Sequence, residues 1–159
     1  MSAFDALYKQ TITIFNRVKG QYDEYALWYP TVIEKCHLII DKASAWSSNG
    51  GRPQDNARLH IRYAIENGKI IVAGKKWLEP KAWRIATDRE LLITFGFGDN
   101  DDFDFFVEGV FNEIPAPISD EQFERKGFYN YMNKKYDNVF AITSVSKYNL
   151  IPHFEITAR

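Results

Sequence analysis

An acidic cluster is the part of this sequence that comes nearest to a metal site. Its carboxylates are Asp99, Asp101, Asp102 and Asp104. A helix–loop–helix calcium loop places oxygen ligands at alternate positions, glycine at the sixth position and glutamate at the twelfth. Counted from Asp99, the sixth position holds Asp104 and the twelfth holds Val110. The cluster therefore fails the calcium pattern. We interpret it as a solvated hairpin tip, with a contact surface for a basic partner as the alternative.

The histidines and the single cysteine are the other side chains that could do chemistry. His37, His60 and His153 lack the spacing of a metal-ligand motif, and the first two lie within strand-like patterns. Cys36 adjoins His37, but neighbours along a strand point to opposite faces, which prevents a thiolate–imidazole pair. We expect structural histidines. The sequence predicts no metal site, no cofactor and no catalytic residue.

Glycine-rich and nucleophile motifs do not suggest an enzyme either. Gly96-Phe97-Gly98 has no third glycine and lies between predicted strands, unlike a phosphate-binding loop, and the nucleophile elbow G-x-S-x-G is absent. A further possibility is a sheet that stacks single-stranded nucleic acid, formed by Arg58, Arg62, Lys69, Lys75 and Lys76 with Tyr63 and Trp77. We favour a solvated strand face for these residues and expect no enzymatic activity.

Composition indicates one folded domain. A chain of 159 residues buries a core without disulfides, and the single cysteine excludes an intrachain disulfide and fits a reducing cytosol. A net charge of −1 argues against a dedicated nucleic-acid binder. The 12 Phe, 9 Tyr and 4 Trp favour strands and interfaces. No signal peptide is recognisable and no apolar run approaches the ~18 residues of a membrane span, so we expect no membrane partner.

The elements that must position these residues are mostly short strands. Alternating or β-branched apolar residues predict strands over 10–16, 58–64, 70–72, 91–95, 105–109, 139–145 and 152–156. Residues 23–40 form either two strands separated at Pro30 or one strand with a bulge. Asn67-Gly68 predicts a tight hairpin turn.

Helices are few in this pattern. One is predicted at 78–83, where Pro80 suits a first helical turn, and another from about residue 120, because Ser119 and Gln122 have capping-box spacing. The chain therefore predicts a mainly β fold, a β-barrel or sandwich of short strands with one or two short helices. We expect a single domain over 1–159, with a flexible loop at about 43–57 and a helical insertion at about 119–135.

Five segments of the sequence, taken in their order along the chain, are similar to segments of one known group of proteins. They are Thr11-Ile12-Thr13-Ile14-Phe15-Asn16, Trp77-Leu78-Glu79-Pro80-Lys81-Ala82-Trp83, Asp104-Phe105-Phe106-Val107-Glu108-Gly109, Lys134-Lys135-Tyr136-Asp137-Asn138-Val139-Phe140-Ala141-Ile142-Thr143-Ser144-Val145 and Pro152-His153-Phe154-Glu155-Ile156. In this order they resemble a group of small structural proteins from phages and prophages of Gram-positive bacteria, encoded in the head–tail connector region. None of these segments is a catalytic signature.

The resemblance implies a connector or stopper subunit that forms a homo-oligomeric ring. Such a ring would bind portal and adaptor proteins above and a tail terminator or tail tube below, and would close the DNA exit and dock the tail. DNA would pass through its channel without sequence-specific binding. The expected location is the virion, at the head–tail junction, after assembly in the bacterial host cytoplasm.

Two other functions compete with this one. The first is a tail-terminator or tail-completion protein, and the second is a small ligand-binding β-barrel that would use Trp77 and Trp83. For the ring, we expect contacts from the loop, the acidic cluster and the last strand, at Trp46, Asn49, Arg52, Asp99, Asp101, Asp102, Phe154 and Ile156.

Overall fold

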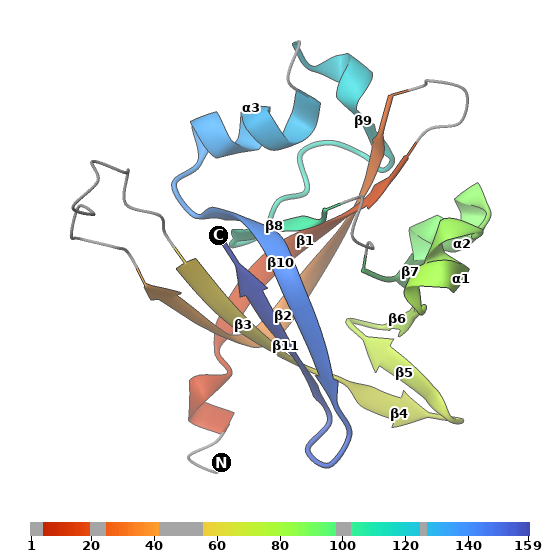
Figure 1. Ribbon diagram of the computed structural model, residues 1–159, viewed down its shortest axis with the longest axis vertical. Coiled ribbons are helices and arrows are strands. Elements are labelled where there is room, and N and C mark those ends of the chain that lie inside the picture. The colour runs from red at the N-terminus through yellow and green to blue at the C-terminus, as the bar shows by residue number, and fades with distance from the viewer. Residues whose placement is uncertain (1–4, 20–24, 42–55, 98–102, 125–126) are drawn as a thin grey trace.

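A closed six-stranded antiparallel barrel is the centre of the fold (Figure 1). A computed structural model describes residues 5–19, 25–41, 56–97, 103–124 and 127–159. The barrel order is β1-β8-β10-β11-β3-β2, and it closes because β2 also pairs with β1. The predicted mainly β class is confirmed, and the barrel is the correct one of the two architectures expected.

Most of the strands belong to the barrel wall. Its members are β1 (Gln10–Val18), β2 (Leu27–Asp41), β3 (Asn56–Arg62), β8 (Phe105–Glu108), β10 (Val139–Tyr148) and β11 (His153–Ala158). The short strand β9 (Ile118–Ser119) pairs with the start of β2. A second sheet contains β4 (Ala64–Glu66), β5 (Lys69–Val72), β6 (Lys75–Trp77) and β7 (Thr94–Phe95). The helical segments are η1 (Asp5–Leu7), α1 (Pro80–Arg84), α2 (Asp88–Ile93), η2 (Asp120–Gln122) and α3 (Gly127–Lys135).

A bulge in β2 allows one strand to serve two sides of the barrel. Gln10 of β1 pairs with Cys36, whereas Ile12 pairs with Ile33, so β2 contains one extra residue there. Lys35, within this step, has a φ of 56°. Beyond the bulge, β2 leaves β1 and pairs with β3. Bulges bend and twist a strand, so the single bulged strand is confirmed over the two-strand alternative.

Two hydrophobic clusters lie on opposite sides of the barrel wall. Ile14 and Phe106 face the interior cluster, whereas Phe15 and Phe105 face an outer cluster beneath α3. Strands β1 and β8 are therefore buried on both faces, which explains the uninterrupted apolar run at 105–107. The interior is filled by side chains, including Phe95 at the end of β7 and Phe97 just after it.

Helix α2 corrects the strand predicted at 91–95. The helix runs from Asp88 to Ile93, and only Thr94 and Phe95 are extended. Thr87 is the N-cap, and its hydroxyl accepts a hydrogen bond from the Glu90 N–H at 3.3 Å. Thr87 and Glu90 have the spacing of a capping box. This local signal outweighs the β-branched run that favoured a strand.

The insertion at 119–135 consists of a 3₁₀ turn followed by α3. The predicted cap is confirmed, because the Ser119 hydroxyl accepts a hydrogen bond from the Glu121 N–H. The helix predicted from about residue 120 is wrong, because Asp120–Gln122 form only the 3₁₀ turn and the α-helix begins at Gly127. The Asp120 carboxylate accepts hydrogen bonds from the Trp28 indole at 2.8 Å and from the Phe128 N–H at 2.9 Å. Gly127, with a φ of 77°, allows this approach, since an added Cβ would lie 2.8 Å from Asp120 Oδ1. Asp120 thus joins the start of α3 to the barrel.

Candidate functional site

The hairpin formed by β10 and β11 has an ordered base. Tyr63, just after β3, donates a hydrogen bond from its hydroxyl to the Tyr148 carbonyl at 2.6 Å and is 2.8 Å from Asn149 Oδ1. The Tyr63 N–H also bonds to the Pro152 carbonyl at 3.3 Å. The rings of Tyr148 and His153 stack with centroids 4.9 Å apart. These contacts hold both ends of the turn in place.

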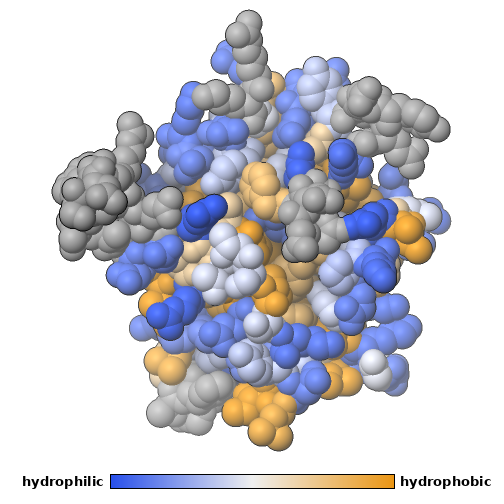
Figure 2. Space-filling view, viewed as in Figure 1, coloured by the Kyte–Doolittle hydropathy of each residue, from blue (hydrophilic) through white to orange (hydrophobic). Residues whose placement is uncertain are grey.

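The turn of this hairpin exposes apolar side chains. Leu150 is 98% exposed and Ile151 is 56% exposed, and Tyr148 at the end of β10 is also exposed. Figure 1 shows the turn at one end of the molecule, and Figure 2 shows hydrophobic surface at that end. We call Leu150 and Ile151 the hairpin tip. An ordered, protruding apolar element of this kind is typical of a protein interface.

A groove lies between η2 and α3, near the other end of the molecule (Figure 1). Its volume is about 800 Å³, and it is lined by Gln122, Phe123, Glu124, Gly127, Asn130, Tyr131 and Lys134. The rings of Phe123 and Tyr131 are 4.8 Å apart in its wall. These two rings offer apolar surface to a protruding side chain of another molecule.

The three histidines converge on the outer face of the barrel. His37 on β2 lies opposite His60 on β3, and His60 lies opposite Glu155 on β11. Ring centroids are 5.5 Å apart for His37 and His60, and 5.8 Å apart for His60 and His153. The sequence contains no metal-ligand spacing among them, yet the fold builds a row of imidazoles.

The electrostatics of this row keep its central member neutral. Burial lowers the pKa of His60, the nearby Glu155 carboxylate opposes that shift, and His37, His153 and Arg58 lower the pKa further. Desolvation and neighbouring positive charge both disfavour the imidazolium form. His60 thus presents a neutral imidazole with one unprotonated nitrogen.

Most of the interface residues expected from sequence cannot be placed. Trp46, Asn49, Arg52, Asp99, Asp101 and Asp102 lie outside the described residues, as does the expected loop at 43–57 except for its last two positions. Their assignment to a ring contact stays a prediction. Asp104, at the end of the acidic cluster, is buried and accepts a hydrogen bond from the Arg17 N–H at 2.8 Å.

Phe154 and Ile156 correct the expectation for the last strand. Both side chains are fully buried in the interior cluster, because the alternation of β11 turns them inward. Strand β11 is hydrogen-bonded to β10 on one side and to β3 on the other. It has no free edge over these residues, and so it pairs within the subunit. These two side chains therefore cannot contact a second copy.

The aromatic and basic residues of the ligand-binding alternative are used in packing. Trp83 is buried against Tyr29, with ring centroids 6.2 Å apart. Trp77 packs on Phe154, with centroids 5.3 Å apart. The Lys75 ammonium donates hydrogen bonds to the Pro30 carbonyl and the Thr31 hydroxyl. These contacts make the residues part of the fold and weaken their case as a ligand surface.

The chain was compared with known protein families, curated proteins and solved structures. A family of unknown function, DUF6751, matches residues 7–159. The chain belongs to this family. No curated protein and no solved structure matches the chain.

The description of DUF6751 names no activity. Any function must therefore be inferred from the hairpin tip, the groove and the histidine row. Sequence reasoning missed both the hairpin tip and the histidine row. His60 and Glu155 each sit between two inward apolar residues, which marks both as outward positions. Their pairing across β3 and β11 has no local signal.

In the part of the chain that the structure describes, no helix is long and apolar enough to cross a bilayer.

Proposed function

We propose that the chain is a ring-forming structural subunit at the head–tail junction of a phage or phage-derived particle, where it closes the DNA exit and docks the tail. The observation that carries this proposal is the hairpin tip. Leu150 is almost fully exposed, although the hydrogen bonds of Tyr63 fix the turn that presents it. A preorganised apolar element loses little entropy on binding. A second copy of the chain is the partner that we assign to it.

The groove between η2 and α3 is the complementary surface. Tip and groove lie near opposite ends of the molecule (Figure 1), so a tip inserted into the groove of the next copy gives a head-to-tail contact. Contacts of this type form rings when the rotation between copies closes. Ring closure repeats each weak contact around the assembly, which strengthens the whole.

The resemblance to connector proteins supports the same proposal through the fold. The segments on which the resemblance rests contain buried residues on both sides of the barrel wall, among them Phe105 and Phe106. They also contain the buried residues Trp83 and Phe154. These residues pack in the barrel and against its attached helices. A tail-terminator role uses the same fold and a similar ring, and binding to a tail tube rather than to portal and adaptor proteins distinguishes the two.

Charged substitutions in the hairpin tip test the proposed contact. We expect Leu150→Asp with Ile151→Asp to weaken association at least tenfold, because burying each apolar side chain contributes about 1.5–3 kcal/mol. Thermal stability should change little, since Leu150 contacts almost nothing in the monomer. Native mass spectrometry under conditions in which the wild type assembles measures the effect. Ile85→Asp, at a distant position that is 83% exposed, is the matched control and should leave assembly intact.

A mixing experiment separates a tip-to-groove contact from other interfaces. Tyr131→Asp should block the groove while its own tip stays intact, and the tip variant keeps an intact groove. Each variant alone should stay monomeric, and an equimolar mixture should form heterodimers but no larger species. A folded tip variant that still assembles like the wild type contradicts the proposed contact, as does loss of assembly in Ile85→Asp.

A further inference from the structure

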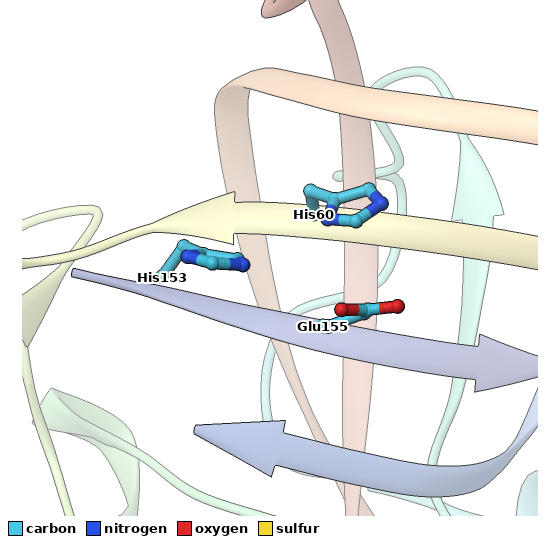
Figure 3. Close-up of side chains that lie close together, drawn as sticks. All are labelled: His60, His153 and Glu155. Carbon is cyan, nitrogen blue, oxygen red and sulfur yellow. The ribbon is translucent and has the colours of Figure 1, made fainter. Parts of the chain in front are cut away.

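His60, His153 and Glu155 form a compact set of metal-ligand side chains on the outer barrel face. One ligand atom from each lies within 4.8 Å of the other two, and all three residues are half-buried. Figure 3 shows the side chains close together, His60 on β3 and the other two on β11. A zinc ion at about 2.0–2.2 Å from each donor holds such atoms roughly 3.3 Å apart. Small side-chain rotations are enough to bring the three ligand atoms from their present separation to the one that zinc requires.

A second observation orients one of these ligands. His153 Nδ1 lies 2.7 Å from the Ile151 carbonyl oxygen. A carbonyl can only accept, so this contact requires a proton on Nδ1, and in the neutral tautomer with that proton the lone pair is on Nε2. A metal-binding histidine commonly donates its other ring N–H to a backbone carbonyl in this way, which fixes the tautomer and the ring plane. The stacked ring of Tyr148 restricts the imidazole further.

The charge around the three side chains favours a bound cation. Glu155 supplies negative charge beside the two imidazoles. A divalent cation at this point would contact two imidazole nitrogens and one carboxylate oxygen.

We propose that His60, His153 and Glu155 bind one divalent transition-metal ion of the zinc class. Two imidazole nitrogens and one carboxylate oxygen match the ligand preferences of Zn²⁺, whereas Ca²⁺ and Mg²⁺ prefer all-oxygen sites. Three protein ligands leave a fourth position of a tetrahedral site open to water or to a group from another molecule. The ion would join β3 to β11 near the base of the hairpin. This proposal does not depend on ring formation.

Zinc titration of the untagged protein tests the site. We expect the wild type to bind one Zn²⁺ per chain by isothermal titration calorimetry, and to show a rise in Tm with added zinc because the folded state alone contains the assembled site. Glu155→Gln and His60→Gln should each weaken binding at least tenfold. Both side chains are only half-buried, so the variants should remain folded without metal, as circular dichroism can verify.

The neighbouring histidine provides a matched control. His37 stacks on His60 but lies outside the ligand set, so His37→Gln should bind Zn²⁺ within about threefold of the wild type, and Co²⁺ bound to both should give the same visible spectrum. Loss of binding in His37→Gln equal to that in His60→Gln shows that the assigned ligand set is wrong. Wild-type binding weaker than about 1 mM, or no difference between wild type and Glu155→Gln, overturns the site itself.

Discussion

Cys36 in the folded protein is expected to react with thiol reagents at pH 8 about a thousand times more slowly than in the unfolded chain. Its side chain is 0% exposed within the barrel interior, and burial raises the pKa of its thiol from 9.0 to about 12. The thiolate is the reactive form. At a pH below both values, each unit of pKa lowers the thiolate fraction tenfold.

Labelling with a chromogenic disulfide in native buffer and in concentrated urea measures this difference. Rapid labelling in native buffer, at the unfolded rate, would show that Cys36 lies outside a closed barrel. The same burial makes stability depend on pH. The unfolded chain releases the thiol proton first, so this contribution to stability is present below pH 9 and is lost as pH rises toward about 12. Cys36→Ala should show a shallower alkaline loss.

Phe128→Ala is expected to lower the free energy of unfolding by about 3–5 kcal/mol. Phe128 is 0% exposed and lies at the centre of the outer cluster. Its ring centroid is 5.0 Å from that of Phe15 and 5.1 Å from that of Phe123. Truncation would leave a cavity beneath α3, while the backbone N–H could still bond to Asp120. Urea denaturation measures this change in the free energy of unfolding, when wild type and variant are fitted with the same dependence on urea concentration.

Tyr131→Ala on the same helix is the control for this variant. Tyr131 is 37% exposed and contacts Phe123 and Lys135 at the surface. Its truncation removes aromatic area but opens no buried cavity, so we expect a loss of about 1 kcal/mol or less. Equal destabilisation by the two substitutions would contradict the placement of α3 on the barrel wall.

Local patterns in the sequence predicted most of the barrel. The alternation in β1 and β3, the Asn67-Gly68 turn and the Ser119 cap each depend on neighbouring residues, and all four are confirmed. Asn67 and Gly68 have φ values of 53° and 75°, as a tight hairpin turn requires. The sequence predicts a strand where part of helix α2 forms, because the β-branched run favours a strand, whereas the Thr87 cap that favours a helix lies before that run.

The candidate sites depend on contacts between distant residues, and local patterns do not encode these. His60 meets Glu155 only because β3 and β11 pair in one register, and a shift of one residue would turn these side chains to the other face. The sequence leaves open whether the final strand pairs within or between subunits, because its neighbours in the barrel have no local signal. The exposure of Leu150 likewise follows from where the hairpin ends relative to the barrel.

The state of assembly is the most direct test of the proposed function. Native mass spectrometry should be carried out on the wild-type protein across a range of concentrations, alone and with portal–adaptor rings or tail-tube rings of the proposed particle. We predict a closed ring, formed either by the protein alone or on the portal–adaptor complex. A protein that stays monomeric at every concentration and binds neither ring contradicts the connector proposal.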